Sequence, residues 1–262
     1  MSRYAAMFER LATEGAFGAF VMLGDGGLEG SAALLERVVQ AGADMVEVGI
    51  PFSDPIADGA VIQAAAKRAL DACVRVADCL KLIERFRVSH PQVPVGILTY
   101  ANVVMAPGRA TFFREARSAG ADSLLVADLP AIEAEPWAEE MRQAEIEPVL
   151  IAAENTPPRT LEKIARLAGG YTYCVSRTGI TGTHAAPSFN GELLKRLQEA
   201  GAPPPVFGFG ISTPMHVRAA LAAGAAGVIS GSAIVSAAAE RRDVAALVHS
   251  LKSATRNDSA PH

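Results

Sequence analysis

The chain has 262 residues, of which 50% are hydrophobic and 20% charged, so it is long enough to bury the core of one large domain or two small ones. Its net charge of −4 comes without a cluster of Lys and Arg, which argues against nucleic acid as a partner. Its three cysteines lack the spacing of a metal or redox site, and its first residues lack the apolar stretch of a signal peptide, so we expect a cytoplasmic protein.

Short apolar segments alternate with amphipathic helical segments along almost the whole chain. A helix is expected first, over residues 3–13, with Met7, Phe8 and Leu11 on one face. Eight strands are expected after it, at 16–23, 45–50, 94–99, 122–127, 147–152, 171–175, 205–209 and 226–230. Because these strands are apolar on both faces, they predict a parallel sheet that helices cover on both sides.

A short repeat marks the ends of several predicted helices. Ala-Gly-Ala occurs at 41–43, 119–121 and 223–225, each time after a helical segment and just before a strand. The glycines that fit the left-handed position at a helix end are Gly42, Gly120, Gly169, Gly201 and Gly224. A recurring unit of helix, glycine and strand is typical of an eightfold barrel.

We therefore predict an α/β fold, a (β/α)8 TIM barrel over residues 1–252, with the extra N-terminal helix as a plug for the amino-terminal mouth. An open, doubly wound sheet is the alternative. It would normally carry a G-x-G-x-x-G turn after the first strand, and residues 23–27 lack that pattern. The polar tail, residues 253–262, is expected to fray.

One segment, residues 219–239, carries no charge over a length that could span a bilayer. It consists mostly of Ala, Gly and Ser, and Gly224, Gly227 and Gly231 interrupt it. Such residues gain little from contact with lipid. We interpret the segment as the end of a helix, a buried strand and a small loop, and we expect no membrane association.

Glu47 lies inside the second predicted strand, between Val46 and Val48. A carboxylate among apolar residues costs several kcal/mol unless it is paired or protonated. One interpretation is a core glutamate that hydrogen-bonds a neighbouring strand. The functional interpretation is a general acid and base whose pKa is raised by its apolar surroundings.

The loop after that strand, residues 51–59, contains Asp54 and Asp58. Asp58 could simply cap the helix expected from Val61, because Asp is a favoured N-cap residue. Two carboxylates that follow a buried glutamate at one strand end are also a candidate cluster for proton transfer.

Glycines follow the last two predicted strands. Gly208 and Gly210 come after the seventh strand, and Gly231 and Ser232 come after the eighth. Backbone N–H groups at such glycines can approach an anion, and Ser232 can begin a short helix whose N-terminus points at it. Ordinary tight turns are the alternative, but the paired occurrence at neighbouring strands favours a phosphate site.

Tyr171 and Tyr173 lie on one face of the sixth predicted strand. The loop after it, residues 176–183, is rich in Gly, Ser and Thr, as expected for an active-site lid or for an ordinary surface loop. The five histidines are dispersed and have no ligand spacing, so we expect no metal site.

These motifs resemble the alpha subunit family of tryptophan synthase over nearly the whole chain. The longest match is VEVGIPFSDPIADG at residues 46–59. The other matching segments follow in the family's order, at 100–102, 126–130, 171–173, 179–182, 208–212 and 230–235.

The resemblance implies a (β/α)8 barrel that cleaves indole-3-glycerol phosphate to indole and glyceraldehyde 3-phosphate, a retro-aldol reaction without a cofactor in this chain. Glu47 matches the family's acid and base, Asp58 the carboxylate that stabilises charge at the indole N–H, and Tyr173 a residue that positions Glu47. The implied substrate-binding residues are Phe20, Leu98 and Leu125 around indole, Thr181 holding Asp58, and Gly182, Gly210, Gly231 and Ser232 at the phosphate.

The resemblance also implies a beta subunit that carries pyridoxal phosphate and receives indole through a tunnel. The matching contact positions are Pro51, Asp54, Asn102 and Pro130, all in loops at one face of the expected barrel. We therefore expect an αββα heterotetramer.

The chain departs from the family's pattern where prolines are usual. Gly26 and Ala60 replace prolines, and residues 152–155 lack one. Fewer prolines loosen loops, which affects lid closure rather than the acid and base.

Two other functions remain open, and a third is disfavoured. The chain could be a free-standing lyase that releases indole, although Pro51, Asp54 and Pro130 argue against it. It could be a non-catalytic activator of the beta subunit, although a degenerate subunit would not need the buried Glu47. A phosphate-sugar isomerase on the same barrel would leave the Asp58 loop unexplained.

Overall fold

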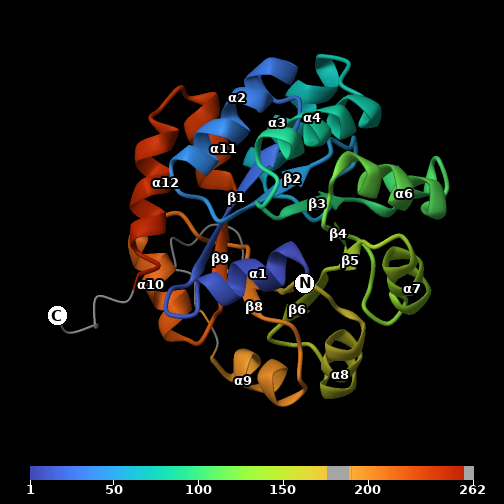
Figure 1. The fold of residues 1–262 in the computed structure, drawn as a ribbon, viewed down its shortest axis with the longest axis vertical. Coiled ribbons are helices and arrows are strands. Elements are labelled where there is room, and N and C mark those ends of the chain that lie inside the picture. The colour runs from blue at the N-terminus through green and yellow to red at the C-terminus, as the bar shows by residue number, and fades with distance from the viewer. Residues whose placement is uncertain (176–188, 190, 257–262) are drawn as a thin grey trace.

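The computed structural model describes residues 1–175, 189 and 191–256, and shows a ring of parallel strands enclosed by helices (Figure 1). The strands are β1 (Ala16–Met22), β2 (Met45–Gly49), β3 (Val95–Thr99), β4 (Ser123–Val126), β5 (Glu147–Pro148), β6 (Leu150–Ala153), β7 (Thr172–Val175), β8 (Pro205–Phe207) and β9 (Gly227–Ser230). The first and last strands pair with each other, which confirms the predicted TIM barrel and rejects the open sheet.

Helices cover the outside of the ring, except for the first helix, which precedes β1. They are α1 (Arg3–Arg10), α2 (Gly27–Gln40), α3 (Ala60–Asp71), α4 (Val76–Ser89), α5 (Ala101–Met105), α6 (Arg109–Ala119), α7 (Glu135–Gln143), α8 (Pro158–Leu167), α9 (Gly191–Glu199), α10 (Pro214–Ala222), α11 (Ser232–Ala239) and α12 (Val244–Ser253). The uncharged segment 219–239 consists of the end of α10, β9 and α11, so its last part is a helix and not the expected loop. Within the described residues, no helix is both long and apolar enough to cross a membrane.

The fifth predicted strand is divided in two. β5 pairs with β4, and β6 pairs with β7, with Val149 between them. Pro148 has no N–H to donate to a ladder, which interrupts the regular pairing at this point. Because β5 and β6 are consecutive pieces of one strand, the chain itself closes the ring.

Two apolar cores lie on either side of the strands. The strands bury nearly all of their residues, as the continuous apolar sequence predicted. Outward-pointing residues such as Val46, Val48 and Ile97 pack against the helices, whereas inward-pointing residues such as Phe20 and Leu125 fill the barrel. A side chain that points inward near the carboxyl end of a strand is therefore placed to reach a site at that end.

The glycines of the Ala-Gly-Ala repeat end helices as predicted. Gly42, Gly120 and Gly224 have φ angles of 109°, 97° and 103°, which residues with a side chain rarely adopt. The prediction for Gly169 was wrong, because Gly170 carries the positive φ.

The N-terminal helix α1 crosses the centre of the ring and closes the amino-terminal end of the barrel (Figure 1). Ser2 caps it by accepting a hydrogen bond from the Ala5 N–H. Tyr4, Met7 and Leu11 are buried in the barrel interior, whereas Phe8 is only partly buried. This confirms the expected plug and adds Tyr4, which the sequence did not single out.

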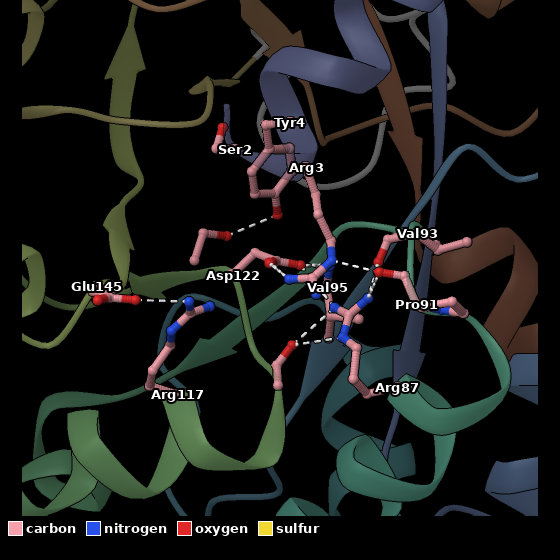
Figure 2. Close-up of polar contacts among 12 residues, drawn as sticks. Ser2, Arg3, Tyr4, Arg87, Pro91, Val93, Val95, Arg117, Asp122 and Glu145 are labelled. Atoms are coloured by element: carbon pink, nitrogen blue, oxygen red, sulfur yellow. Dashed lines mark hydrogen bonds and ion pairs between the residues drawn. The ribbon is translucent and has the colours of Figure 1, made fainter.

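Ion pairs hold the plug to the barrel (Figure 2). Arg3 donates to Asp122 at 2.6 Å and to the Pro91 carbonyl at 2.6 Å. Arg87 donates to the other Asp122 oxygen at 2.8 Å and to the carbonyls of Val93 and Gly120. The buried Asp122 carboxylate thus has two cations as partners, as the burial of a charge requires.

The expected fraying from Ser253 differs from the structure over its first residues. Ala254 and Thr255 are buried, and the Thr255 carbonyl accepts a hydrogen bond from the Gly15 N–H. Just before them, Lys252 donates to Asp44 at 2.8 Å. The rest of the predicted tail, 257–262, lies outside the described residues.

Candidate active site

A cavity of about 390 Å³ opens at the carboxyl ends of the strands. Of the residues expected to act on or bind a substrate, nine line this cavity: Phe20, Glu47, Asp58, Leu98, Leu125, Tyr173, Gly210, Gly231 and Ser232. The other two, Thr181 and Gly182, lie outside the described residues. The barrel therefore brings together residues that are up to 212 positions apart in the chain, from Phe20 to Ser232.

Glu47 points into the barrel from the middle of β2 and is 3% exposed. The Tyr171 hydroxyl donates a hydrogen bond of 2.7 Å to its Oε1 atom. Burial raises the pKa of Glu47 to about 7; the Tyr171 hydrogen bond lowers this pKa, and the nearby Asp58 charge raises it. Near neutral pH this carboxyl is therefore present in both protonation states, as a group that both donates and accepts a proton requires.

Asp58 lies in the loop between β2 and α3 and is half-buried. It does not cap α3, because the N-cap position is Gly59 and no side chain caps that helix. Tyr100, at the end of β3, accepts a hydrogen bond from the Ala57 N–H at 3.2 Å and hydrogen-bonds the Asp58 carboxyl. Burial raises the pKa of Asp58, and the Tyr100 hydrogen bond opposes this rise.

Two tyrosines of the β7 segment have different partners from those expected. Tyr173 was expected to position Glu47, but its hydroxyl donates to the Gly208 carbonyl at 2.8 Å. Tyr171, one layer deeper, donates to Glu47 instead. The alternation of side chains along a strand places both residues on the inward face, but it does not say which of them reaches the carboxyl.

Tyr100 is a second residue for which the sequence predicted no role of its own. It stood in a matching motif at 100–102, and the signal that could have marked it is its place at the end of β3. β3 pairs with β2, so side chains that follow these two strands come close to each other. A hydroxyl at that position is therefore placed to contact the loop that carries Asp58.

The middle of the cavity is apolar. Phe20, Leu98 and Leu125 line it, together with Ile62, Ile151 and Ile229. Such a surface accepts a flat apolar ring, while the carboxyls of Glu47 and Asp58 supply the polar contacts.

The other end of the cavity is built from backbone. Gly210 follows β8, and Gly231 and Ser232 follow β9, whose C-terminal end leads directly into α11. Ser232 is the first residue of α11, and Gly231, Ser232 and Ala233 line the cavity, so the first turn of that helix lies at the cavity wall. N–H groups at a helix N-terminus and at glycine turns attract an anion such as phosphate.

The four expected partner-contact residues follow β2, β3 and β4, which are neighbours in the sheet. Asp54, Asn102 and Pro130 are exposed, whereas Pro51 is buried. Asn102 lies in α5 and not in a loop as expected. The segments that follow these three strands also expose Ile56, Met105 and Ile132.

The comparisons with known proteins agree with this geometry. A sequence model of the family described as "Tryptophan synthase alpha chain" matches residues 8–259. The tryptophan synthase alpha chain of Shewanella amazonensis is 48% identical over 238 residues, which are 90% of this chain and 90% of that protein.

Solved structures show the same fold. The tryptophan synthase of Mycobacterium tuberculosis has a chain with a TM-score of 0.88 and 29% identity, covering 98% of this chain and 99% of that chain. Tryptophan synthase subunit alpha from Legionella pneumophila has a TM-score of 0.84 and 29% identity, over 97% and 98% of the two chains. The chain belongs to the tryptophan synthase alpha chain family.

Proposed function

We propose that this chain is a lyase that cleaves indole-3-glycerol phosphate to indole and glyceraldehyde 3-phosphate. The observation that carries the proposal is the buried Glu47 carboxyl, with a pKa of about 7, in one cavity with Asp58. An apolar middle section and a glycine-rich end of the same cavity suit the indole ring and the phosphate.

The chemistry follows from the positions of the two carboxyls. Protonated Glu47 donates its proton to indole C3, which leaves positive charge on the ring nitrogen. Asp58, as a carboxylate, accepts a hydrogen bond from that N–H and stabilises the charge. Glu47, now a carboxylate, removes the proton of the neighbouring glycerol hydroxyl. The electron pair of that O–H bond forms the aldehyde C=O, the C–C bond breaks, and its electrons return to the indole ring.

No step of this reaction needs a cofactor in this chain. Gly210, Gly231 and Ser232 bind the phosphate through backbone N–H groups and the Ser232 hydroxyl. Thr181 and Gly182 remain predicted contacts to Asp58 and the phosphate. Tyr173 contributes to the wall of the cavity through its bond to Gly208.

The partner in this proposal is a tryptophan synthase beta subunit that carries pyridoxal phosphate and uses the released indole, in a cytoplasmic αββα heterotetramer. The exposed Asp54, Asn102 and Pro130 lie beside the carboxyl end of the barrel, where indole would leave. Exposed apolar side chains on the same segments support a protein contact there.

The test is cleavage of indole-3-glycerol phosphate by the purified chain, alone and with a beta subunit, with indole as the measured product. The proposal predicts slow cleavage by the chain alone and a large increase with the beta subunit. Fast cleavage by the chain alone would identify a free-standing lyase. The absence of cleavage in both mixtures, with tryptophan synthesis from added indole still enhanced, would identify a non-catalytic activator.

A further inference from the structure

A row of buried hydroxyl groups lies beneath Glu47, on the side away from the cavity. Tyr171 donates to Glu47 at 2.7 Å, and the Tyr4 hydroxyl, from the plug helix α1, shares a hydrogen bond of 2.8 Å with Ser123 of β4. Tyr4, Ser123 and Tyr171 are each 1% exposed. The row therefore runs inside the barrel, from the plug to the carboxyl that we propose as the acid and base.

Gly96 makes room for this row. A Cβ atom at this position of β3 would lie 2.9 Å from the Ser123 Oγ, 3.0 Å from the Tyr4 hydroxyl and 3.7 Å from the Tyr171 hydroxyl. Three hydroxyls from separate elements thus meet around one residue without a side chain. Any larger residue there would push at least one of them away.

The plug holds Tyr171 through packing. The rings of Tyr4 and Tyr171 lie 5.4 Å apart between centroids and are tilted by 56°. The Tyr4 ring also packs against the backbone just before Tyr171, since a Cβ at Gly170 would lie 3.0 Å from its Cδ2. Tyr4 itself is fixed by Ser123, and its neighbour Arg3 by Asp122 (Figure 2).

We propose that Tyr171 and Tyr4 are positioning residues for Glu47: Tyr171 holds the carboxyl from below, and the Tyr4 ring holds Tyr171. This inference rests on the proposed catalytic role of Glu47 and extends it to the amino-terminal end of the barrel. The N-terminal helix then contributes to the reaction as well as closing the barrel.

The protonation of Glu47 reports on this arrangement. The groups that face it are Tyr171 and Tyr173 from the β7 segment, Asp58 from the loop after β2, and Tyr4 from α1. Of these, Tyr171 donates a hydrogen bond to the carboxyl, which favours its charged form. Loss of that hydrogen bond therefore raises the pKa of Glu47.

The experiment is a pH titration of the Glu47 carboxyl by infrared difference spectroscopy in the full chain. The C=O band of the protonated carboxyl is assigned to Glu47 by its loss in Glu47→Gln. This readout needs no enzymatic activity, so it stands even if the chain does not cleave the proposed substrate. Circular dichroism of each variant confirms that it is folded.

Two pairs of variants make the test specific. Tyr171→Phe removes only the hydroxyl, and we expect it to raise the Glu47 midpoint by about one pH unit, the scale of one hydrogen bond to a charged group. Tyr4→Leu removes the ring that supports Tyr171, and we expect a smaller rise. Tyr4→Phe and Ser123→Ala keep both rings and lose only the Tyr4–Ser123 hydrogen bond, so the midpoint stays at the wild-type value.

An unchanged midpoint in Tyr171→Phe would overturn the proposal, whether or not the protein cleaves its substrate. A midpoint in folded Tyr4→Leu equal to that in Tyr4→Phe would overturn the role of the plug. Where cleavage is measurable, the pH at which the rate is half-maximal moves with the midpoint, which a purely structural effect of either substitution would not produce.

Discussion

Asp122, at the amino-terminal end of the barrel, and Glu47 and Asp58, at the carboxyl end, have opposite kinds of partner. The Asp122 carboxylate accepts hydrogen bonds from the Arg3 and Arg87 side chains and from the backbone N–H of Val95. At the carboxyl end, Glu47 and Asp58 have hydroxyl partners, and within the described residues neither is paired with a cation. Their pKa values are raised by burial as a result.

This difference in partners separates carboxyls that stabilise the fold from carboxyls that are suited to proton transfer. A paired carboxylate stays charged and holds elements together. A carboxyl that is buried without a cation can exchange a proton near neutral pH, which proton transfer requires. Substitutions at the two ends should therefore separate into effects on the reaction and effects on the free energy of unfolding.

The largest effect expected after that of Glu47 itself is that of Asp58→Asn. The amide keeps the shape of the side chain but removes the charge that stabilises the protonated indole ring. We expect cleavage to fall by about 10²–10³-fold, with the melting temperature close to that of the wild type. A cleavage rate within twofold of wild type would contradict the role given to Asp58.

At the opposite end, Arg87→Ala should act mainly on stability. It leaves the buried Asp122 without one of its cations and the Gly120 and Val93 carbonyls without a donor, and we expect a loss of about 3 kcal/mol in the free energy of unfolding. Urea denaturation measures it, and cleavage by the folded variant should fall far less than in Asp58→Asn.

The matched control is Arg85→Ala on the same helix, α4. Arg85 pairs with Glu29, and both side chains are exposed, so we expect no measurable change. Equal losses of stability in the two arginine variants would contradict the distinction between buried and exposed pairs.

The raised pKa of Glu47 predicts the direction of a pH effect on stability. The folded protein holds the proton up to a pH of about 7, whereas the unfolded chain releases it near 4.5. The contribution of Glu47 is thus fully present below pH 4.5, and about 3 kcal/mol is lost as the pH rises through 7. Urea denaturation between pH 4.5 and 8 should show a shallower fall in Glu47→Gln than in the wild type; parallel curves would contradict the assignment.

A smaller effect is expected from Tyr100→Phe. The variant loses the hydrogen bond to the Asp58 carboxyl, so the pKa of Asp58 rises and its charged form becomes less populated. We expect the loss of cleavage to be largest at the acidic end of the pH profile and to become smaller as the pH rises and Asp58 becomes charged. A loss that is the same across the pH profile would point to a packing defect instead.

Much of this arrangement could be predicted from the sequence, because the pattern of apolar residues indicates which residues are buried and the order in which the strands occur. The buried Glu47 between two valines already indicated both an inward-facing carboxyl and a raised pKa. The glycines after β8 and β9 do line the cavity, at the end where we propose that the phosphate binds.

Other features depend on distances between side chains of different elements, which the periodicity of apolar residues does not predict. Tyr171 and Tyr173 share a strand face, but only the structure shows which of them reaches Glu47. The division of the fifth strand at Val149 depends on which neighbour each half pairs with. The contacts of Tyr4 and Tyr100 arise between elements far apart in the chain, so a local pattern could not reveal them.

The most direct test of the account is the rate of indole release from indole-3-glycerol phosphate by the wild type and by Glu47→Gln, with a beta subunit present and substrate in excess. Glutamine fills the same space but cannot transfer the proton. We predict a loss of at least about 10³-fold in rate, with folding and assembly unchanged. A variant that still releases indole at a rate near that of the wild type would contradict the central claim that Glu47 is the acid and base.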